Sequence, residues 1–160
     1  MNPADDMVRE ILDQPSVVRR VLDEALPLLQ KFVRDHGLKR LWLVGCGDMY
    51  LAAEAAAEVA RPGGLSLCAA RSMDLRWRDQ QLTAGDGLVV ASISGRTPRT
   101  LEALRRAQAA GVPTLAVVDD VHSPLAAESP NVLPLKTAEG CAFENPVYEG
   151  YSSEAPQTRT

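Results

Sequence analysis

The sequence has few aromatic residues, only two histidines and no excess of positive charge. Aromatic side chains make up 4% of the 160 residues, and the formal net charge at pH 7 is -4. A surface that binds nucleic acid usually carries clustered positive charge, so this balance argues against such a partner. Any phosphate binding by this chain must therefore come from local loop geometry instead of a basic field.

Cysteine is also scarce, and no long apolar segment is present. Cys46, Cys68 and Cys141 are odd in number and show no Cys-x-x-Cys spacing, which argues against a disulfide framework and against a zinc site. No apolar run approaches the roughly 20 residues that cross a bilayer, and the acidic N-terminus is unlike a signal peptide. We expect a cytoplasmic protein with no membrane partner, no metal ion and no cofactor.

Residues 1–36 are predicted to be an N-terminal helical segment, because apolar side chains recur there at helical spacing. Pro15 is expected to break or restart the helix, with Ser16 as the cap of a second one. Pro27 falls inside the apolar stripe of that second helix, so a kink or a boundary is expected there. These helices precede the sheet, and their apolar faces must be buried against another surface. We therefore expect them to form a buried dimer surface.

Residues 37–136 are predicted to be the main domain, in which short apolar runs alternate with helical patterns. The predicted strands are residues 41–44, 65–70, 88–93, 114–118 and 132–135. Helices are predicted at residues 51–59, from Thr97 to about Gly111, and at 124–128. Alternation of this kind predicts a parallel sheet covered on both faces. We predict an α/β flavodoxin-like three-layer sandwich with five parallel strands in the order 2-1-3-4-5.

This strand order also predicts where a ligand would bind. In open parallel sheets, ligands bind beyond the carboxyl ends of the strands, where the strand order reverses. Here the reversal lies between the first and third strands, so residues 45–50 and 92–97 are expected to border the ligand. Residues 137–160 are expected to form a loop over the cleft and the truncated start of a following segment.

Residues 92–97 read Ser-Ile-Ser-Gly-Arg-Thr and combine hydroxyls with a flexible backbone at the start of a helix. Ser92, Ser94 and Thr97 provide three hydroxyls, and Gly95 allows the backbone to approach a ligand closely. The helix N-terminus that follows favours an anion. Arg96 could add charge, although the sequence does not give its direction. The alternative interpretation is an ordinary strand-to-helix turn capped by Thr97.

Residues 45–50 read Gly-Cys-Gly-Asp-Met-Tyr and do not form a dinucleotide-binding turn. That motif would need a glycine at Tyr50 and an acidic residue at the end of the second strand. A P-loop is absent as well. Gly45 and Gly47 have no side chains, so they are expected to leave room for a sugar beside the backbone. Asp48 either caps the next helix or accepts hydrogen bonds from sugar hydroxyls, and Cys46 has no base nearby in the sequence.

Taken together, these motifs resemble the sugar isomerase (SIS) domain family, and the likeness spans most of the chain. Residues 7–15 look like the "M…EI…QP" start of the isomerase half of glutamine–fructose-6-phosphate aminotransferases. Residues 45–50 resemble that group's "CGTSY" loop, and residues 92–97 resemble its "SQSGET" loop. Residues 155–159 look like the segment that ends the first of two such domains. The order and spacing of the motifs together are specific.

The resemblance implies a phosphosugar-binding domain with two groups of ligand contacts. The implied phosphate-binding residues are Ser92, Ser94, Gly95 and Thr97. The implied sugar-contacting residues are Cys46, Gly47, Asp48 and Met49. The family's catalytic glutamate and lysine belong to a second domain beyond Thr160, so no catalytic residue is assigned in this chain. The resemblance also implies a homodimer or pairing with a second domain of the same kind.

Several residues depart from the family's pattern. Ile93 replaces a glutamine that would help to hold the ligand, and Arg96 replaces an acidic residue. Asp48 and Met49 replace Thr and Ser, which removes two hydroxyls. These changes point to a divergent relative, such as an aminosugar-phosphate deaminase or deglycase. The role of His122, which follows the fourth predicted strand and could line the cleft, stays open.

Three functions remain in competition at this point. The first is the N-terminal half of an aminosugar-phosphate isomerase, deaminase or aminotransferase-like enzyme, in which a carboxylate base from elsewhere moves a proton between C1 and C2. The second is a non-catalytic phosphosugar-sensing or regulatory module. The third, a flavodoxin-like domain for a nucleotide or flavin, is disfavoured because few aromatic residues lie near the two loops.

Overall fold

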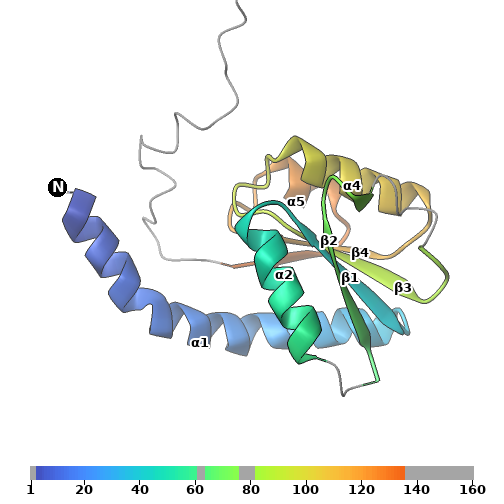
Figure 1. Cartoon of the computed structure of the whole chain (residues 1–160), viewed down its shortest axis with the longest axis horizontal. Helices are drawn as coiled ribbons and strands as arrows, with labels where there is room; N and C mark the ends of the chain where they lie inside the picture. The colour runs from blue at the N-terminus through green and yellow to red at the C-terminus, as the bar shows by residue number, and fades with distance from the viewer. Residues whose placement is uncertain (1–2, 61–63, 76–81, 136–160) are drawn as a thin grey trace, which may run out of the picture.

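The computed structural model describes residues 3–60, 64–75 and 82–135, which form five parallel strands and the helices around them (Figure 1). The strands pair in the order β2-β1-β3-β4-β5, which confirms the predicted order. In chain order the elements are α1 (Pro3–Asp35), β1 (Arg40–Gly45), α2 (Asp48–Val59), β2 (Ser66–Arg71), β3 (Asp86–Ala91), α4 (Pro98–Ala109), β4 (Thr114–Val118), α5 (Pro124–Glu128) and β5 (Val132–Pro134).

The N-terminal segment is one continuous, bent helix, so the predicted break at Pro15 is wrong (Figure 1). Both Pro15 and Pro27 lie inside α1. A proline removes one backbone hydrogen bond and crowds the preceding turn, but helical turns on both sides can still carry the helix through. Ser16 does not cap a second helix, because its hydroxyl donates back to the Asp13 carbonyl at 2.8 Å.

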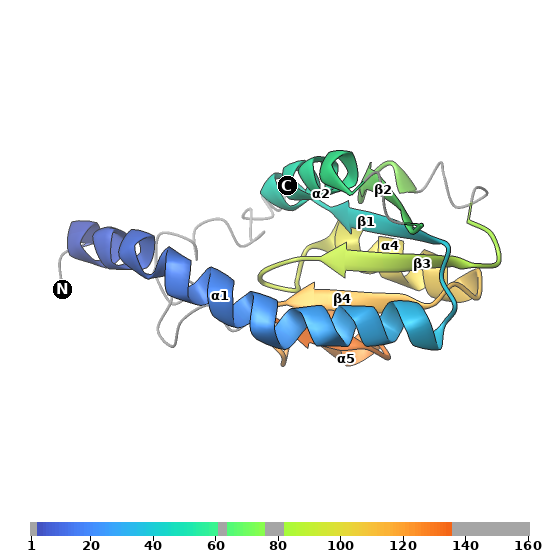
Figure 2. The same cartoon turned by 90° about the horizontal axis from the view of Figure 1, so that it is seen from below.

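Helices cover both faces of the sheet, which gives three layers (Figure 2). The C-terminal half of α1 packs Leu29, Phe32 and Val33 onto one face, against Leu41 of β1 and neighbouring strands. Helices α4 and α5 cover the opposite face, where their apolar residues meet Trp42, Val44, Leu88 and Val90. Neighbouring strand residues thus point to opposite faces, as a sheet buried on both sides requires.

Among the boundaries that differ from the sequence prediction, two fall at the carboxyl edge of the sheet, beside the loops of interest. Strand β3 ends at Ala91, two residues before the predicted end, because the chain turns there and Gly95 donates its N–H to the Ser92 carbonyl at 3.1 Å. Helix α2 begins at Asp48 instead of residue 51. The irregular segments are therefore residues 46–47 and 92–97, which frame the ends of β1 and β3.

Some predictions fall on residues that lie outside the described part. These are the loop and following segment at 137–160, Cys141 and the motif at 155–159. Within the residues that the structure describes, no helix combines the length and the apolar character that spanning a membrane requires.

Candidate functional site at the carboxyl edge of β1 and β3

Two hydroxyls of the loop at residues 92–97 face each other at the start of α4. Ser92 is 4% exposed, and its Oγ lies 3.2 Å from Thr97 Oγ1. Ser92 Oγ also accepts a hydrogen bond from the Gly95 N–H at 3.2 Å. The Gly95 amide is therefore used inside the loop, where it shapes the turn around the two hydroxyls.

Gly95 is required by a close approach between two parts of the protein. Its φ is +61°, and a Cβ at this position would lie 2.0 Å from Ser123 Oγ and 2.4 Å from Ser123 Cβ. Ser123 caps α5 by accepting from the Ala126 N–H, and Leu125 donates its N–H to the Gly95 carbonyl at 3.1 Å. The structure thus shows that Gly95 clears space for Ser123, and the close approach of its backbone to a ligand stays a prediction.

Helix α4 begins as the sequence predicts, with Thr97 at the N-cap and Pro98 as its first residue. The Thr97 hydroxyl makes no capping hydrogen bond, however, and pairs with Ser92 instead. The first turn contains no acidic residue. An uncompensated helix N-terminus with two hydroxyls beside it suits an anion, because the amide groups and the helix dipole favour negative charge.

Arg96 is exposed, and its guanidinium is engaged by an aspartate. Its Nη1 donates to Asp120 Oδ2 at 2.7 Å and to the Ser94 carbonyl at 3.0 Å. The hydrogen bond from Arg96, together with one from the backbone N–H of His122, lowers the pKa of Asp120. His122 thus lies beside this loop, and its side chain is exposed. The charge that Arg96 could offer to a phosphate is already shared with Asp120.

The loop after β1 begins with a tight glycine turn. Gly47 occupies the N-cap of α2 with a φ of +53°, and Asp48 and Met49 stand in the first turn of that helix. The prediction that Asp48 caps the helix is wrong, although a carboxylate in the first turn still complements the helix dipole. A Cβ on Gly45 would lie 2.5 Å from Met49 Cβ, so the helix can start this close to β1 only because residue 45 is glycine.

Two buried hydroxyls that sequence reasoning left out of the site connect its two loops. Thr100 is 1% exposed, and its Oγ1 lies 3.2 Å from Ser72 Oγ and 3.8 Å from Cys46 Sγ. The Ser72 N–H donates to the Gly45 carbonyl at 2.9 Å. The spacing of Thr97 and Thr100 could have indicated this role, because residues three apart lie on the same side of a helix. The position of Ser72 depends on strand pairing.

The outer side of the loop at 45–50 carries a small polar group of side chains. Arg71, at the end of β2, places its guanidinium 4.8 Å from the centre of the Tyr50 ring. The Tyr50 hydroxyl donates to the Glu54 carboxylate, and this hydrogen bond raises the pKa of Tyr50. The loop is thus held from β2 on one side and from α2 on the other.

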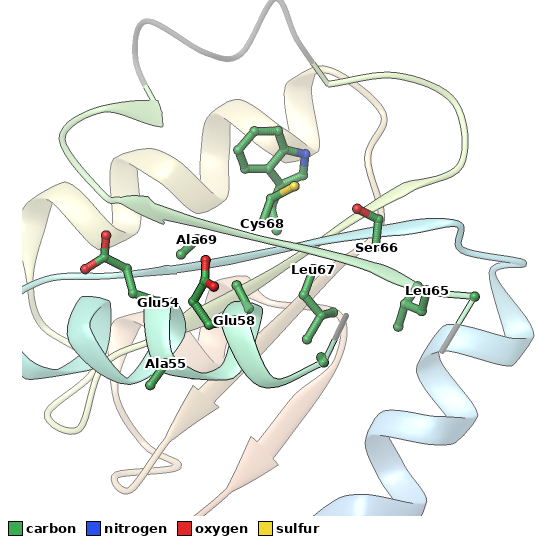
Figure 3. A pocket seen from close by; sticks show the side chains of 12 residues that line it. Glu54, Ala55, Glu58, Leu65, Ser66, Leu67, Cys68 and Ala69 are labelled. Carbon is green, nitrogen blue, oxygen red and sulfur yellow. The ribbon is translucent and has the colours of Figure 1, made fainter. Parts of the chain in front are cut away.

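One hollow of the described structure lies elsewhere, along the outer edge of the sheet (Figure 3). It measures about 920 Å³ and runs between α2 and the edge strand β2. Figure 3 shows Glu54 and Glu58 on the side of α2 that faces Leu67 and Cys68 of β2. No residue of 92–97 lines this hollow. We place the candidate site at the two loops, because hydroxyls and a helix N-terminus converge there.

Comparison with known proteins identifies the family of this chain. Residues 37–147 match the family model for the SIS domain. The chain belongs to the SIS domain family. The glutamine–fructose-6-phosphate aminotransferase (isomerizing) of Bradyrhizobium diazoefficiens is 33% identical over 138 residues, which are 80% of this chain and 22% of that enzyme. The SIS chain thus spans about a fifth of the length of the curated relatives it matches.

Solved structures of SIS proteins share the fold. The C-terminal domain of glucosamine-fructose-6-phosphate aminotransferase from Francisella tularensis superposes with a TM-score of 0.67 and 25% identity, over 84% of this chain and 40% of that one. Glucosamine-6-phosphate deaminase from Thermotoga maritima gives a TM-score of 0.64 at 21% identity, over 84% of this chain and 41% of that one. The second likeness supports the fold alone.

Proposed function

We propose that this SIS domain binds a sugar phosphate, with the phosphate at residues 92–97 and the sugar beside residues 46–49. The proposed phosphate-binding residues are Ser92, Ser94, Gly95 and Thr97, and the proposed sugar-contacting residues are Cys46, Gly47, Asp48 and Met49. The observation that carries the proposal is the pair of hydroxyls of Ser92 and Thr97, 3.2 Å apart at the N-terminus of α4. The relatives named after sugar phosphates support the choice of ligand.

The chemistry of the loop suits a phosphate without a strong positive charge. Hydroxyls can turn their protons toward phosphate oxygens, and backbone amides at a helix N-terminus add further donors. Gly95 contributes by shaping the turn, because its amide bonds to Ser92. Arg96 contributes little net charge while Asp120 is paired with it. Such a site would favour a small phosphate ester over a polyanion.

The reaction we propose for the complete enzyme is that of an aminosugar-phosphate isomerase, deaminase or aminotransferase. This chain would supply its N-terminal half, with residues 1–36 as a helical segment, 37–136 as the binding domain and 137–160 as a connection. After ring opening, a carboxylate base would move a proton between C1 and C2 of the sugar. We expect that base to come from a second domain or a partner subunit, because no residue of this chain matches it.

A non-catalytic phosphosugar-sensing module is the second candidate, and the state of Asp120 favours it. Asp120 is the carboxylate tied directly to the phosphate loop, and its ion pair with Arg96 lowers its pKa. A carboxylate stabilised in this way is a weak base. If the purified chain converts fructose-6-phosphate or glucosamine-6-phosphate, the sensing function is excluded. Binding of either sugar without turnover by this chain alone is expected for both candidates, because the first one takes its base from outside this chain.

We also propose that a second copy of this chain packs against the exposed apolar residues of α1. The N-terminal half of α1 projects past the sheet (Figure 2), and a row of apolar residues along α1, from this half into the next, is exposed. Val8, Ile11, Val18, Leu22 and Leu26 are 47–57% exposed. This row continues the apolar face that already packs on the sheet, so a second apolar helix fits against it. Light scattering should give a dimer mass, and a monomer at micromolar concentration contradicts the pairing.

Calorimetric titration of three variants with glucosamine-6-phosphate and fructose-6-phosphate tests the binding site. Thr97→Val and Ser94→Ala each remove a hydroxyl from the loop, and each should weaken binding about tenfold or more, as expected for hydrogen bonds to a charged group. Ser66→Ala removes an exposed hydroxyl that lines the hollow beside β2 and should leave the affinity unchanged. If Ser66→Ala weakens binding while the loop variants bind normally, the ligand sits in the hollow and the proposed site is wrong.

A further inference from the structure

One threonine joins the two loops that we assign to different parts of the ligand. Thr100 belongs to the first turn of α4, directly after the proposed phosphate loop, and it is almost fully buried. Its hydroxyl contacts Cys46 of the proposed sugar loop at 3.8 Å and Ser72, at the end of β2, at 3.2 Å. The structure therefore contains a buried polar bridge that crosses the carboxyl ends of β1 and β2 and reaches α4.

Backbone hydrogen bonds connect the two ends of this bridge to the two loops. The Ser72 N–H donates to the Gly45 carbonyl, so the strand end that carries Ser72 also holds the start of the sugar loop. Thr100 donates its own N–H to the Thr97 carbonyl at 3.0 Å, which links it to the proposed phosphate loop. A shift of Thr100 would therefore change the distance between the two loops.

We infer that Thr100 is a positioning residue that sets the separation between the phosphate loop and the sugar loop. The inference rests on the proposed function and deepens it. A sugar phosphate must meet both loops at once, and binding groups need to be held within about 0.5 Å of their productive geometry. Inorganic phosphate meets only the phosphate loop, so its affinity does not depend on the separation. The bridge thus selects ligands whose sugar and phosphate fit one fixed distance.

Thr100→Val tests the inference, because valine keeps the shape of threonine and removes only the hydroxyl. We expect it to weaken glucosamine-6-phosphate binding about five- to tenfold, the effect of one lost hydrogen bond and a relaxed loop. Inorganic phosphate is titrated by NMR on the same samples. Its affinity for the variant should stay within about twofold of its affinity for the unmodified chain, because it contacts only the phosphate loop. Thr100→Ser keeps the hydroxyl and should restore the sugar phosphate affinity.

Thr114→Val provides the matched control. Thr114 is 1% exposed, and its hydroxyl has no hydrogen-bond partner among the described residues. It begins β4, at the amino edge of the sheet, away from both loops. Its change to valine makes the same chemical deletion in an equally buried place and should leave both affinities unchanged.

The outcomes separate the inference from the proposed function. If the unmodified chain binds neither ligand, the proposed function is wrong, and the inference that rests on it is overturned as well. If the unmodified chain binds glucosamine-6-phosphate and Thr100→Val binds it equally well, the inference alone is overturned. Equal losses for sugar phosphate and inorganic phosphate would show that Thr100 only stabilises the fold, which also overturns it.

Discussion

The two edges of the sheet handle polar groups in opposite ways. At the amino edge, Arg40 of β1 and Asp86 of β3 are register partners and form a two-pronged ion pair, with N–O distances of 2.7 and 2.6 Å. At the carboxyl edge the same two strands lead to Gly45 and Ser92, and the buried polar groups that meet there are uncharged hydroxyls. One edge buries charge, and the other buries groups without charge.

This difference follows from what each edge can satisfy internally. Asp86 is 2% exposed, and the Thr83 N–H and hydroxyl add to the two hydrogen bonds from Arg40. The Arg40 guanidinium also lies 5.3 Å from the centre of the Trp42 ring. The carboxylate of Asp86 at the amino edge is thus satisfied by partners from the protein itself. Hydroxyls at the carboxyl edge can exchange one partner for another at low cost, which leaves that edge free to bind a ligand.

The largest effect on the carboxyl edge should come from Gly95→Ala. The added Cβ would overlap Ser123, and the positive φ adds strain, so we expect a loss of about 3–5 kcal/mol in unfolding free energy. Gly111→Ala is the control, because its φ is also positive at +72° but nothing lies within 4 Å of the new Cβ. That variant should lose only about 1–2 kcal/mol, the strain alone. Urea unfolding of both variants measures the difference, and equal losses would show that contact with Ser123 is unimportant.

At the amino edge, Asp86→Asn should be the next largest change. It turns one carboxylate oxygen into an N–H group that faces other donors, and it removes the negative charge of Asp86 that pairs with Arg40. Because Arg40 is about a third exposed and can reach water, we expect a loss of about 2–3 kcal/mol. Sugar phosphate affinity at the opposite edge should not change. A variant that loses affinity in proportion to stability would show that the two edges are coupled.

The same pair predicts how stability depends on pH. Burial raises the pKa of Asp86, but hydrogen bonds from Arg40 and Thr83 outweigh it, so the pKa in the folded protein is lowered. A lowered pKa contributes stability above the unfolded value of about 3.9 and loses it as the pH falls through the folded value. The stability gap between the unmodified chain and Asp86→Asn should therefore stay constant from neutral pH to about pH 5 and shrink below pH 4. A gap that stays at its full neutral-pH size at pH 2–3 would contradict this assignment.

The smallest effect should come from an ion pair of the same geometry on the surface. Arg105 and Glu128 also form a two-pronged pair, with distances of 2.7 and 2.6 Å, but both side chains are solvated. Water screens such a pair and already solvates each partner, so Glu128→Gln should leave the unfolding midpoint almost unchanged. Thermal unfolding of Glu128→Gln and Asp86→Asn under the same conditions compares the two unfolding midpoints. A loss as large as that of Asp86→Asn would show that pair geometry, and not burial, decides the contribution.

The sequence predicted the sheet well, because apolar runs and helical spacing are local signals. The strand order, α5 and the start of α4 at Pro98 are all confirmed. It was wrong about a break at Pro15, and of its two alternatives for Asp48 the structure excludes the helix cap. Whether a proline breaks a helix depends on the turns on both sides, and whether an aspartate caps one depends on which residue the chain turns at, here Gly47. The pairing of Ser92 with Thr97 could be anticipated from their place in one short loop, although its geometry could not.

By itself the sequence determined that this chain forms a five-stranded parallel sheet of the SIS family and which two loops follow β1 and β3 at its carboxyl edge. Those features follow from patterns that repeat within a few residues. Only the tertiary structure decided that Gly95 clears space for Ser123, that Asp120 engages Arg96, and that Thr100 reaches both Ser72 and Cys46. Each of these contacts joins residues more than 20 positions apart, and such pairs meet only after strand order and helix placement have been set.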